Sequence, residues 1–122
     1  GAIEEVLSEH QSVAECAVIG IADKLKGQLP IGLISLKAEV QKDNKTISKE
    51  CIQMVRDKVG PVAAFKTAIV VKRLPKTRSG KILRGTVKKI ADSEEYKLPA
   101  TIDDPAILDE IKQNLIENGI LK

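Results

Sequence analysis

Residues 74–84 hold the densest group of side chains in this chain that could do chemistry. Gly80 lets the backbone approach a ligand closely, and the hydroxyls of Thr77 and Ser79 can donate hydrogen bonds. We expect a helix to begin at this loop, where free main-chain N–H groups favour an anion. Lys81 would then lie in the first turn, where a cation costs roughly 0.3 to 1 kcal/mol against the helix dipole unless an anion binds beside it. The segment therefore predicts a site for a phosphate or a carboxylate.

The pair Gly80-Lys81 does not fit a Walker A loop. That motif needs a glycine at position 75 to open the phosphate cradle and a serine or threonine at position 82 to hold magnesium. This chain has Pro75 and Ile82 there. The sequence therefore predicts anion binding of another kind.

The positive charge of the chain is concentrated around this loop. Residues 66–89 hold nine of the 20 lysines and arginines and no aspartate or glutamate. The rest of the chain has 11 basic and 17 acidic residues, a balance of −6, although the whole chain carries +3. Such a basic segment favours an anionic partner: a phosphate, a nucleic acid or an acidic protein face. A solvated cationic surface without a ligand is the other interpretation.

A free-standing nucleic-acid-binding module is the alternative function. Lys81, Arg84 and Lys88 recur at intervals of three and four, which puts them on one face of the expected helix, and such a face can contact phosphates. Phe65 and Tyr96 are the only aromatic residues, so the chain lacks the stacking surfaces of a single-strand reader. No residue pattern favours a third reading, a scaffold for an acidic partner.

Length and composition favour one folded, soluble domain. With 122 residues, 43% hydrophobic and 30% charged, the chain has a globular balance that excludes disorder. No apolar run approaches the ~20 residues of a membrane span, and residues 1–15 lack the pattern of a signal peptide. Cys16 and Cys51 have no Cys-x-x-Cys spacing, so we expect two reduced, buried thiols rather than a zinc site or a disulfide.

Apolar periodicity predicts the elements that position the loop. Helical spacing indicates helices over residues 2–10 and 46–59, and a helix from Ser79 onward. Apolar, β-branched runs predict strands over residues 16–21, 31–36 and 67–71, the first two antiparallel because the connection between them is short.

The C-terminal part of the chain completes an α+β fold. Residues 92–104 form a polar connector, and Asp104-Pro105 begins a last helix. The order α-β-β-α-β-α-α then predicts a small three-stranded sheet flanked by helices, in a single domain over residues 1–122 whose residues 92–122 are connector and C-terminal helix.

The loop sequence Leu-Pro-Lys-Thr-Arg-Ser-Gly-Lys-Ile, followed by Leu-Arg, resembles the signature near the C-terminus of AMP-forming short-chain acyl-CoA synthetases. These are the acetyl- and propionyl-CoA synthetases of the adenylate-forming superfamily. The resemblance extends over nearly the whole chain, and its propionate-like parts are residues 61–65 and 101–105. Other matching segments are residues 3–13, 17–20, 26–28 and 55–61.

This resemblance implies an enzyme, an acid-thiol ligase, that joins ATP and a short carboxylic acid into an acyl-adenylate and then transfers the acyl group to coenzyme A. The lysine matching Lys81 enters the active site only for adenylation, where its charge offsets that of the reacting anions. Thr77, Arg78, Ser79 and Gly80 form the ATP and adenylate loop. Lys81 also matches a known acetylation target, which implies a lysine deacetylase as a partner.

Two further sites are implied by the same resemblance. Arg56 matches an arginine that contacts the phosphorylated end of coenzyme A, although an exposed helix cation is the plainer reading. Ser8, His10 and Val13 match a structural magnesium site built from main-chain oxygens and the histidine. The plainer reading of His10 is a helix cap or a half-buried side chain.

The resemblance starts after the hinge and the large N-terminal adenylation domain of these enzymes. We therefore expect this chain to be a mobile lid, inactive alone, whose partner is the N-terminal domain of the same protein. No membrane or nucleic-acid partner is expected. Reduced cysteines suit the cytoplasm and the mitochondrial matrix equally. Neither the acid nor the oligomeric state follows from these residues.

Overall fold

The computed structural model describes residues 2–25, 27–61 and 64–121. Within these ranges the elements follow the predicted order. They are α1 (Ala2–Ser8), β1 (Val13–Asp23), β2 (Gly27–Leu36), α2 (Asn44–Lys58), β3 (Thr67–Val71), α3 (Arg84–Ala91) and α4 (Ala106–Glu117).

The strands form one sheet with β2 in the centre, in the order β1-β2-β3. β1 pairs with β2 antiparallel, with Ile19 opposite Ile31, and β3 pairs with β2 parallel, with Leu33 opposite Ile69. A parallel pair needs a crossover connection, and α2 provides it. The predicted α+β class and the antiparallel first pair are confirmed.

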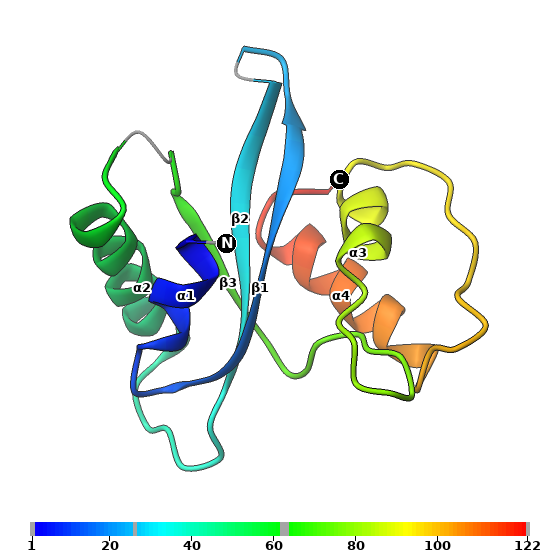
Figure 1. Cartoon of the computed structure of the whole chain (residues 1–122), viewed down its shortest axis with the longest axis horizontal. Helices are drawn as coiled ribbons and strands as arrows, with labels where there is room; N and C mark the ends of the chain where they lie inside the picture. The colour runs from blue at the N-terminus through cyan, green and yellow to red at the C-terminus, as the bar shows by residue number, and fades with distance from the viewer. Residues whose placement is uncertain (1, 26, 62–63, 122) are drawn as a thin grey trace.

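Helices cover both faces of the sheet, with α1 and α2 on one side and α3 and α4 on the other (Figure 1). Successive side chains of a strand point to opposite faces, so Ile31 and Leu33 pack with α3 and α4 while Ile34 packs with α1 and α2. None of the three is more than 2% exposed. Burying each such side chain contributes roughly 1.5 to 3 kcal/mol.

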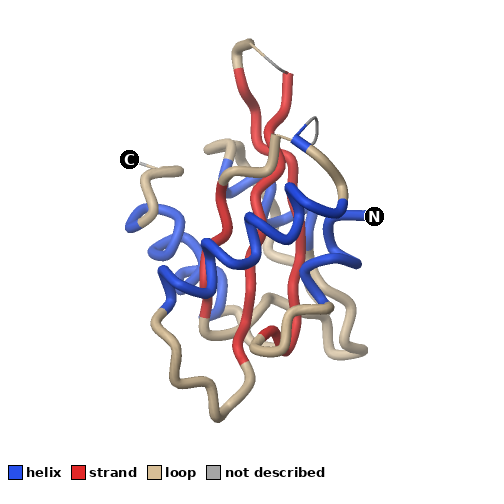
Figure 2. The backbone as a smooth tube through the Cα atoms, turned by 90° about the vertical axis from the view of Figure 1, so that its left-hand side faces the viewer, coloured by secondary structure: helices blue, strands red, loops and turns tan. Residues whose placement is uncertain are grey.

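The first two strands are longer than their apolar runs. They extend to Asp23 and from Gly27, and their outer ends form a hairpin that projects beyond the helices (Figures 1 and 2). Main-chain pairing continues to Asp23 opposite Gly27 whether or not the side chains are apolar. Apolar patterning therefore underestimated both strands.

Helix boundaries differ by a few residues from the predicted ones. α1 ends at Ser8 instead of residue 10, and α2 begins at Asn44 because Asp43 caps it: the Asp43 carboxylate accepts a 2.7 Å hydrogen bond from the Thr46 N–H. In the described part of the chain no helix is long and apolar enough to cross a bilayer.

The third helix begins later than predicted, at Arg84 rather than at Ser79. Gly80 has φ +91°, which a right-handed helix does not allow, and the Thr77 N–H donates to Lys81 O at 2.8 Å across a tight turn. Lys81 thus lies in a hairpin-like loop, so the prediction of a lysine in the first turn of a helix is wrong. The expected helical face shared by Lys81, Arg84 and Lys88 does not form.

The connector over residues 92–104 is more than a polar linker. Its Ile102 is 4% exposed and forms a bridge with Thr77, while Asp92 accepts a 2.8 Å hydrogen bond from the Ala22 N–H. The connector therefore packs against the loop that carries the candidate site. In Figure 1 the yellow-green loop lies beside the orange segment at the lower right.

Candidate functional site

Residues 74–83, which we call the Lys81 loop, are closed by their own hydrogen bonds. The Gly80 N–H donates to Thr77 O at 2.9 Å, and the Leu83 N–H donates to Pro75 O at 2.9 Å. The Thr77 hydroxyl accepts the Lys81 N–H at 3.1 Å and lies 3.0 Å from the Ser79 hydroxyl. These hydroxyls therefore shape the turn as well as offering oxygen atoms.

The connector over residues 92–104 forms main-chain hydrogen bonds with the Lys81 loop. The Arg78 N–H donates to Thr101 O, and the Asp103 N–H donates to Lys76 O, both at 2.9 Å. Leu74 is 3% exposed and anchors the start of the loop in the core shared by the sheet, α3 and α4. The loop backbone is thus fixed by its own turn and by a second segment.

Two ion pairs hold the flanks of the loop. Lys76 pairs with Glu15 of β1. Arg84 makes a forked contact with Glu4 of α1, at 2.9 Å from Nε to Oε2 and 2.6 Å from Nη2 to Oε1. The bond from Arg84 lowers the pKa of Glu4 and raises that of Arg84, because each charge stabilises the other.

Lys81 and Arg78 remain exposed on this framework, and no described carboxylate forms an ion pair with either. A lysine on a fixed backbone can hold one positive charge at a defined place. That is what neutralising a carboxylate or a phosphate requires. The structure thus places Thr77, Arg78, Ser79, Gly80 and Lys81 together in one tight turn, whereas the sequence predicts Lys81 in the first turn of a helix.

Ion pairs neutralise much of the basic segment over residues 66–89. Four of its nine cations bind carboxylates: Arg73, Lys76, Arg84 and Lys88. Two of these, Arg84 and Lys88, belong to the stripe that the nucleic-acid alternative needs. Because Lys81 lies outside α3, it does not share a helical face with Arg84 and Lys88, and the nucleic-acid alternative rests on the basic segment over residues 66–89 alone.

Sequence reasoning missed Glu4, Glu15 and the role of residues 99–103. An acid in the first turn of a helix already suits the helix dipole, so Glu4 gave no separate signal. Glu15 gave no separate signal either, because a carboxylate that stays 42% exposed does not need a partner.

Arg56 lies apart from the Lys81 loop. It is exposed on α2, which covers the opposite face of the sheet from α3 and α4. A small hollow beside it is lined by Phe65, Lys66 and the turn after α2, including Gly60 and Pro61. The structure therefore does not bring Arg56 and Lys81 together.

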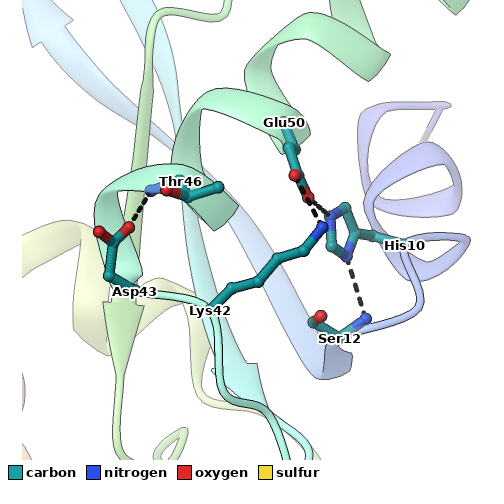
Figure 3. Close-up of polar contacts among 6 residues, drawn as sticks. All are labelled: His10, Ser12, Lys42, Asp43, Thr46 and Glu50. Atoms are coloured by element: carbon teal, nitrogen blue, oxygen red, sulfur yellow. Dashed lines mark hydrogen bonds and ion pairs between the residues drawn. The ribbon is translucent and has the colours of Figure 1, made fainter.

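His10 lies at the turn after α1 and is 9% exposed. Its Nδ1 accepts the Ser12 N–H at 3.0 Å, so its Nε2 carries the proton and donates to Glu50 at 2.7 Å (Figure 3). Lys42 also bonds Glu50, at 2.9 Å. These contacts from Lys42 and His10 lower the pKa of Glu50. Both nitrogens of the His10 ring are thus engaged.

In this structure both ring nitrogens of His10 are hydrogen-bonded, so neither is free to bind magnesium. Among the described residues, no group of three or more histidine, cysteine, aspartate or glutamate side chains could hold a metal ion. His10 O already accepts the Val13 N–H at 3.1 Å. What fits a hard cation here is main-chain oxygen, and the imidazole does not.

Both cysteines are free thiols. Cys51 is fully buried, and burial raises its pKa to about 11. Cys16 is only half-buried, a difference from the expectation of two buried thiols, and burial also raises its pKa.

Residues 2–81 match a family described as the AMP-binding enzyme C-terminal domain. The match runs from the start of α1 to Lys81 itself and includes Arg56 and His10. This chain belongs to that family. α3 and α4 lie beyond the matched residues of the AMP-binding C-terminal domain.

Curated relatives of this AMP-binding C-terminal domain resemble it over most of its length. An uncharacterised protein of Pseudomonas aeruginosa is 52% identical over 115 residues, 94% of this chain and 18% of that protein. The mitochondrial acyl-CoA synthetase short-chain family member B of Dictyostelium discoideum is 50% identical over 111 residues, 91% of this chain and 16% of that protein. The chain thus spans less than a fifth of the length of these relatives.

A solved structure extends the likeness to α3 and α4. The acetoacetyl-CoA synthetase from Streptomyces lividans matches with a TM-score of 0.76 at 19% identity, over 97% of this chain and 18% of that one. At this identity the likeness concerns the fold alone. The helices beyond Lys81 therefore belong to the same fold as the rest of the AMP-binding C-terminal domain.

Proposed function

We propose that this chain is the C-terminal lid domain of an AMP-forming short-chain acyl-CoA synthetase, an acid-thiol ligase that acts on acetate or propionate. The observation that carries the proposal is Lys81, an exposed cation that pairs with no carboxylate of the described residues and lies on the Lys81 loop of a domain of this family. The relative in Dictyostelium discoideum, which is named a short-chain acyl-CoA synthetase, supports the class of enzyme.

Lys81 serves adenylation. The ammonium group lies beside the substrate carboxylate and the α-phosphate of ATP and offsets the negative charge that accumulates as the two anions approach. Thr77, Arg78, Ser79 and Gly80 hold the turn that carries it. The carboxylate attacks the α-phosphorus of bound ATP, the bond from that phosphorus to the β-phosphate oxygen breaks, and the acyl-adenylate and pyrophosphate result.

Arg56 serves the second half-reaction. Its guanidinium suits a forked contact with the phosphorylated end of coenzyme A. Arg56 and Lys81 lie in opposite layers of the domain, so a single orientation does not present both to one site. The domain therefore turns against an N-terminal adenylation domain between the two half-reactions.

Exposure of Lys81 also makes it a target for regulation. Acetylation removes the positive charge that adenylation needs, and a lysine deacetylase restores it. Magnesium enters the proposal in two ways: with ATP, and at the turn of Ser8, His10 and Val13 through main-chain oxygens. The cytoplasm and the mitochondrial matrix both suit such an enzyme, and the relative named mitochondrial supports the second.

The two half-reactions of the full-length synthetase test the proposal separately. Acid-dependent exchange of pyrophosphate into ATP reports adenylation, and a supplied acyl-adenylate with coenzyme A reports thioester formation. We expect Lys81→Ala to abolish most of the exchange and spare the thioester step, and Arg56→Ala to do the reverse. Lys89→Ala, which removes another exposed cation of the basic segment, is the matched control. Equal activity of Lys81→Ala and Lys89→Ala in exchange would reject the proposal.

A further inference from the structure

β1 is an edge strand, and its outer side is where two layers of the domain are joined. Among the strands of the described residues, β1 pairs with β2 and with no other. On the free side, the Val18 N–H donates to Glu4 Oε2 at 2.8 Å, and the Ala22 N–H donates to Asp92 Oδ1 at 2.8 Å. Because these residues are four apart, both N–H groups point to the same edge. Carboxylates thus cover the exposed edge of the sheet.

The carboxylate of Glu4 accepts three hydrogen bonds from two residues. It accepts the edge N–H of Val18 and both bonds of the forked contact with Arg84. Glu4 belongs to α1 and Arg84 to α3, which cover opposite faces of the sheet. The contact therefore passes around the edge of β1 and fixes the first residue of α3 against α1.

Arg84 is three residues after Lys81, so fixing Arg84 restricts where the backbone at Lys81 can lie. On the other flank Lys76, five residues before Lys81, pairs with Glu15 of the same strand β1. At the far end of α3, Asp92 binds Lys88 at 2.6 Å as well as the Ala22 N–H. The loop and α3 are thus attached to β1 at three points: before the lysine through Lys76, after it through Arg84, and at the end of α3 through Asp92.

We propose that Glu4 and Glu15 are positioning residues for Lys81, which set the place of its ammonium group by holding the two flanks of the Lys81 loop against β1. This inference rests on the proposed role of Lys81 in adenylation. Neither glutamate touches substrate; each acts through a cation next to the loop. A displacement of about 1 Å in such a framework can cost as much as a hundredfold in rate.

The variants Glu4→Gln and Glu15→Gln in the full-length synthetase test the inference. Glutamine keeps an oxygen for the Val18 N–H but removes the charge that holds Arg84, so the fold is retained. Arg84→Lys tests the same contact from the other side, since lysine keeps the charge and loses the forked geometry. Glu9→Gln is the matched control, because it breaks an ion pair of equal charge with Lys58, away from the loop.

We expect Glu4→Gln to slow adenylation about tenfold in kcat and to leave thioester formation from a supplied acyl-adenylate within about twofold. Glu15→Gln should show the same split to a lesser degree. In hydrogen exchange of the full-length protein, peptides covering residues 74–84 should exchange faster in both variants than in Glu9→Gln. A purely structural role would lower both half-reactions together.

A double variant distinguishes failure of this inference from failure of the proposed function. If Glu4 acts through Lys81, Glu4→Gln should have no further effect on adenylation in a Lys81→Ala background. An adenylation rate in Glu4→Gln equal to that of Glu9→Gln, with Lys81→Ala strongly impaired, would overturn the positioning role alone. Unimpaired adenylation in Lys81→Ala itself would overturn the proposed function and the positioning role with it.

Discussion

The Lys81 loop and the turn around His10 are both polar segments next to a helix, and they use their key side chains in opposite ways. In the loop, Thr77 and the main chain make the hydrogen bonds, and the Lys81 ammonium stays exposed. In the turn, His10 is nine-tenths buried, and both of its ring nitrogens are hydrogen-bonded, one to Ser12 and the other to Glu50 (Figure 3).

The difference shows how to tell a functional side chain from a structural one. A group that binds a ligand must be left without partners inside the protein while its neighbours are fixed. A group whose bonding capacity is already filled contributes to stability instead. The Lys81 loop meets the first description, and the His10 side chain meets the second.

The largest expected effect is on activity without a change in stability. Lys81→Ala in the full-length synthetase should lower adenylation by about 100-fold or more, because a charge aimed at the reacting anions is lost. The free energy of unfolding, measured by urea denaturation, should stay within about 0.5 kcal/mol, since the ammonium has no internal partner. A clear loss of stability would mean that Lys81 holds the fold and would remove the contrast with His10.

At the other turn the opposite result is expected. His10→Ala should lower the free energy of unfolding by about 2 kcal/mol, because the Ser12 N–H loses its acceptor and the nearly buried ring leaves a void, while the more exposed Glu50 keeps Lys42. Gln11→Ala, at an exposed neighbouring position, is the control and should change stability by less than about 0.5 kcal/mol. The loss should be the same with magnesium and with a chelator. A loss seen only with magnesium present would restore the histidine as a ligand.

Substitutions of two glycines in or near the Lys81 loop test whether its turn depends on backbone conformation. Gly80→Ala should destabilise by about 1 to 2 kcal/mol because φ is +91° there, although no atom of a described residue beyond its two chain neighbours lies within 4 Å of the added Cβ. Gly85→Ala, inside α3 and also with open space, should stabilise by up to about 1 kcal/mol. Equal effects in thermal unfolding would mean that Gly80 does not need its left-handed conformation.

The smallest expected effect is a dependence on acid pH at the flank of the loop. The forked contact with Arg84 lowers the pKa of Glu4, so the unfolded chain binds the proton more tightly than the folded one. Stability from this contact is therefore complete above about pH 5 and is lost as the pH falls through the lowered pKa.

Glu4→Gln should reduce the fall in stability between about pH 5 and pH 3 by less than about 1 kcal/mol. Glu5→Gln, one residue along the same helix and exposed, should leave that fall unchanged. Denaturant unfolding at several pH values measures both variants. Parallel curves for Glu4→Gln and the unsubstituted protein would contradict the contribution of the ion pair.

Sequence patterns predicted most helices and strands because the residue types and spacing within a short segment favour one secondary structure. Thr67–Val71 was predicted to its ends, since a short β-branched run between turns has few alternatives. α3 was placed too early because Ile82 and Leu83 extend its apolar stripe. Both residues do pack on the same core, but from a loop. Periodicity reports which side chains are buried and not which backbone conformation buries them.

By itself the sequence determined the α+β order, the family and the loop that carries Lys81, because residue types at short spacing specify strands, helices and signature motifs. Only the tertiary structure decided that Lys81 lies in a turn, that His10 is hydrogen-bonded to Glu50, and that Glu4 forms an ion pair with Arg84. The contacts of His10 with Glu50 and of Glu4 with Arg84 join residues 40 and 80 positions apart. Their geometry arises when the layers pack, so no local pattern encodes it.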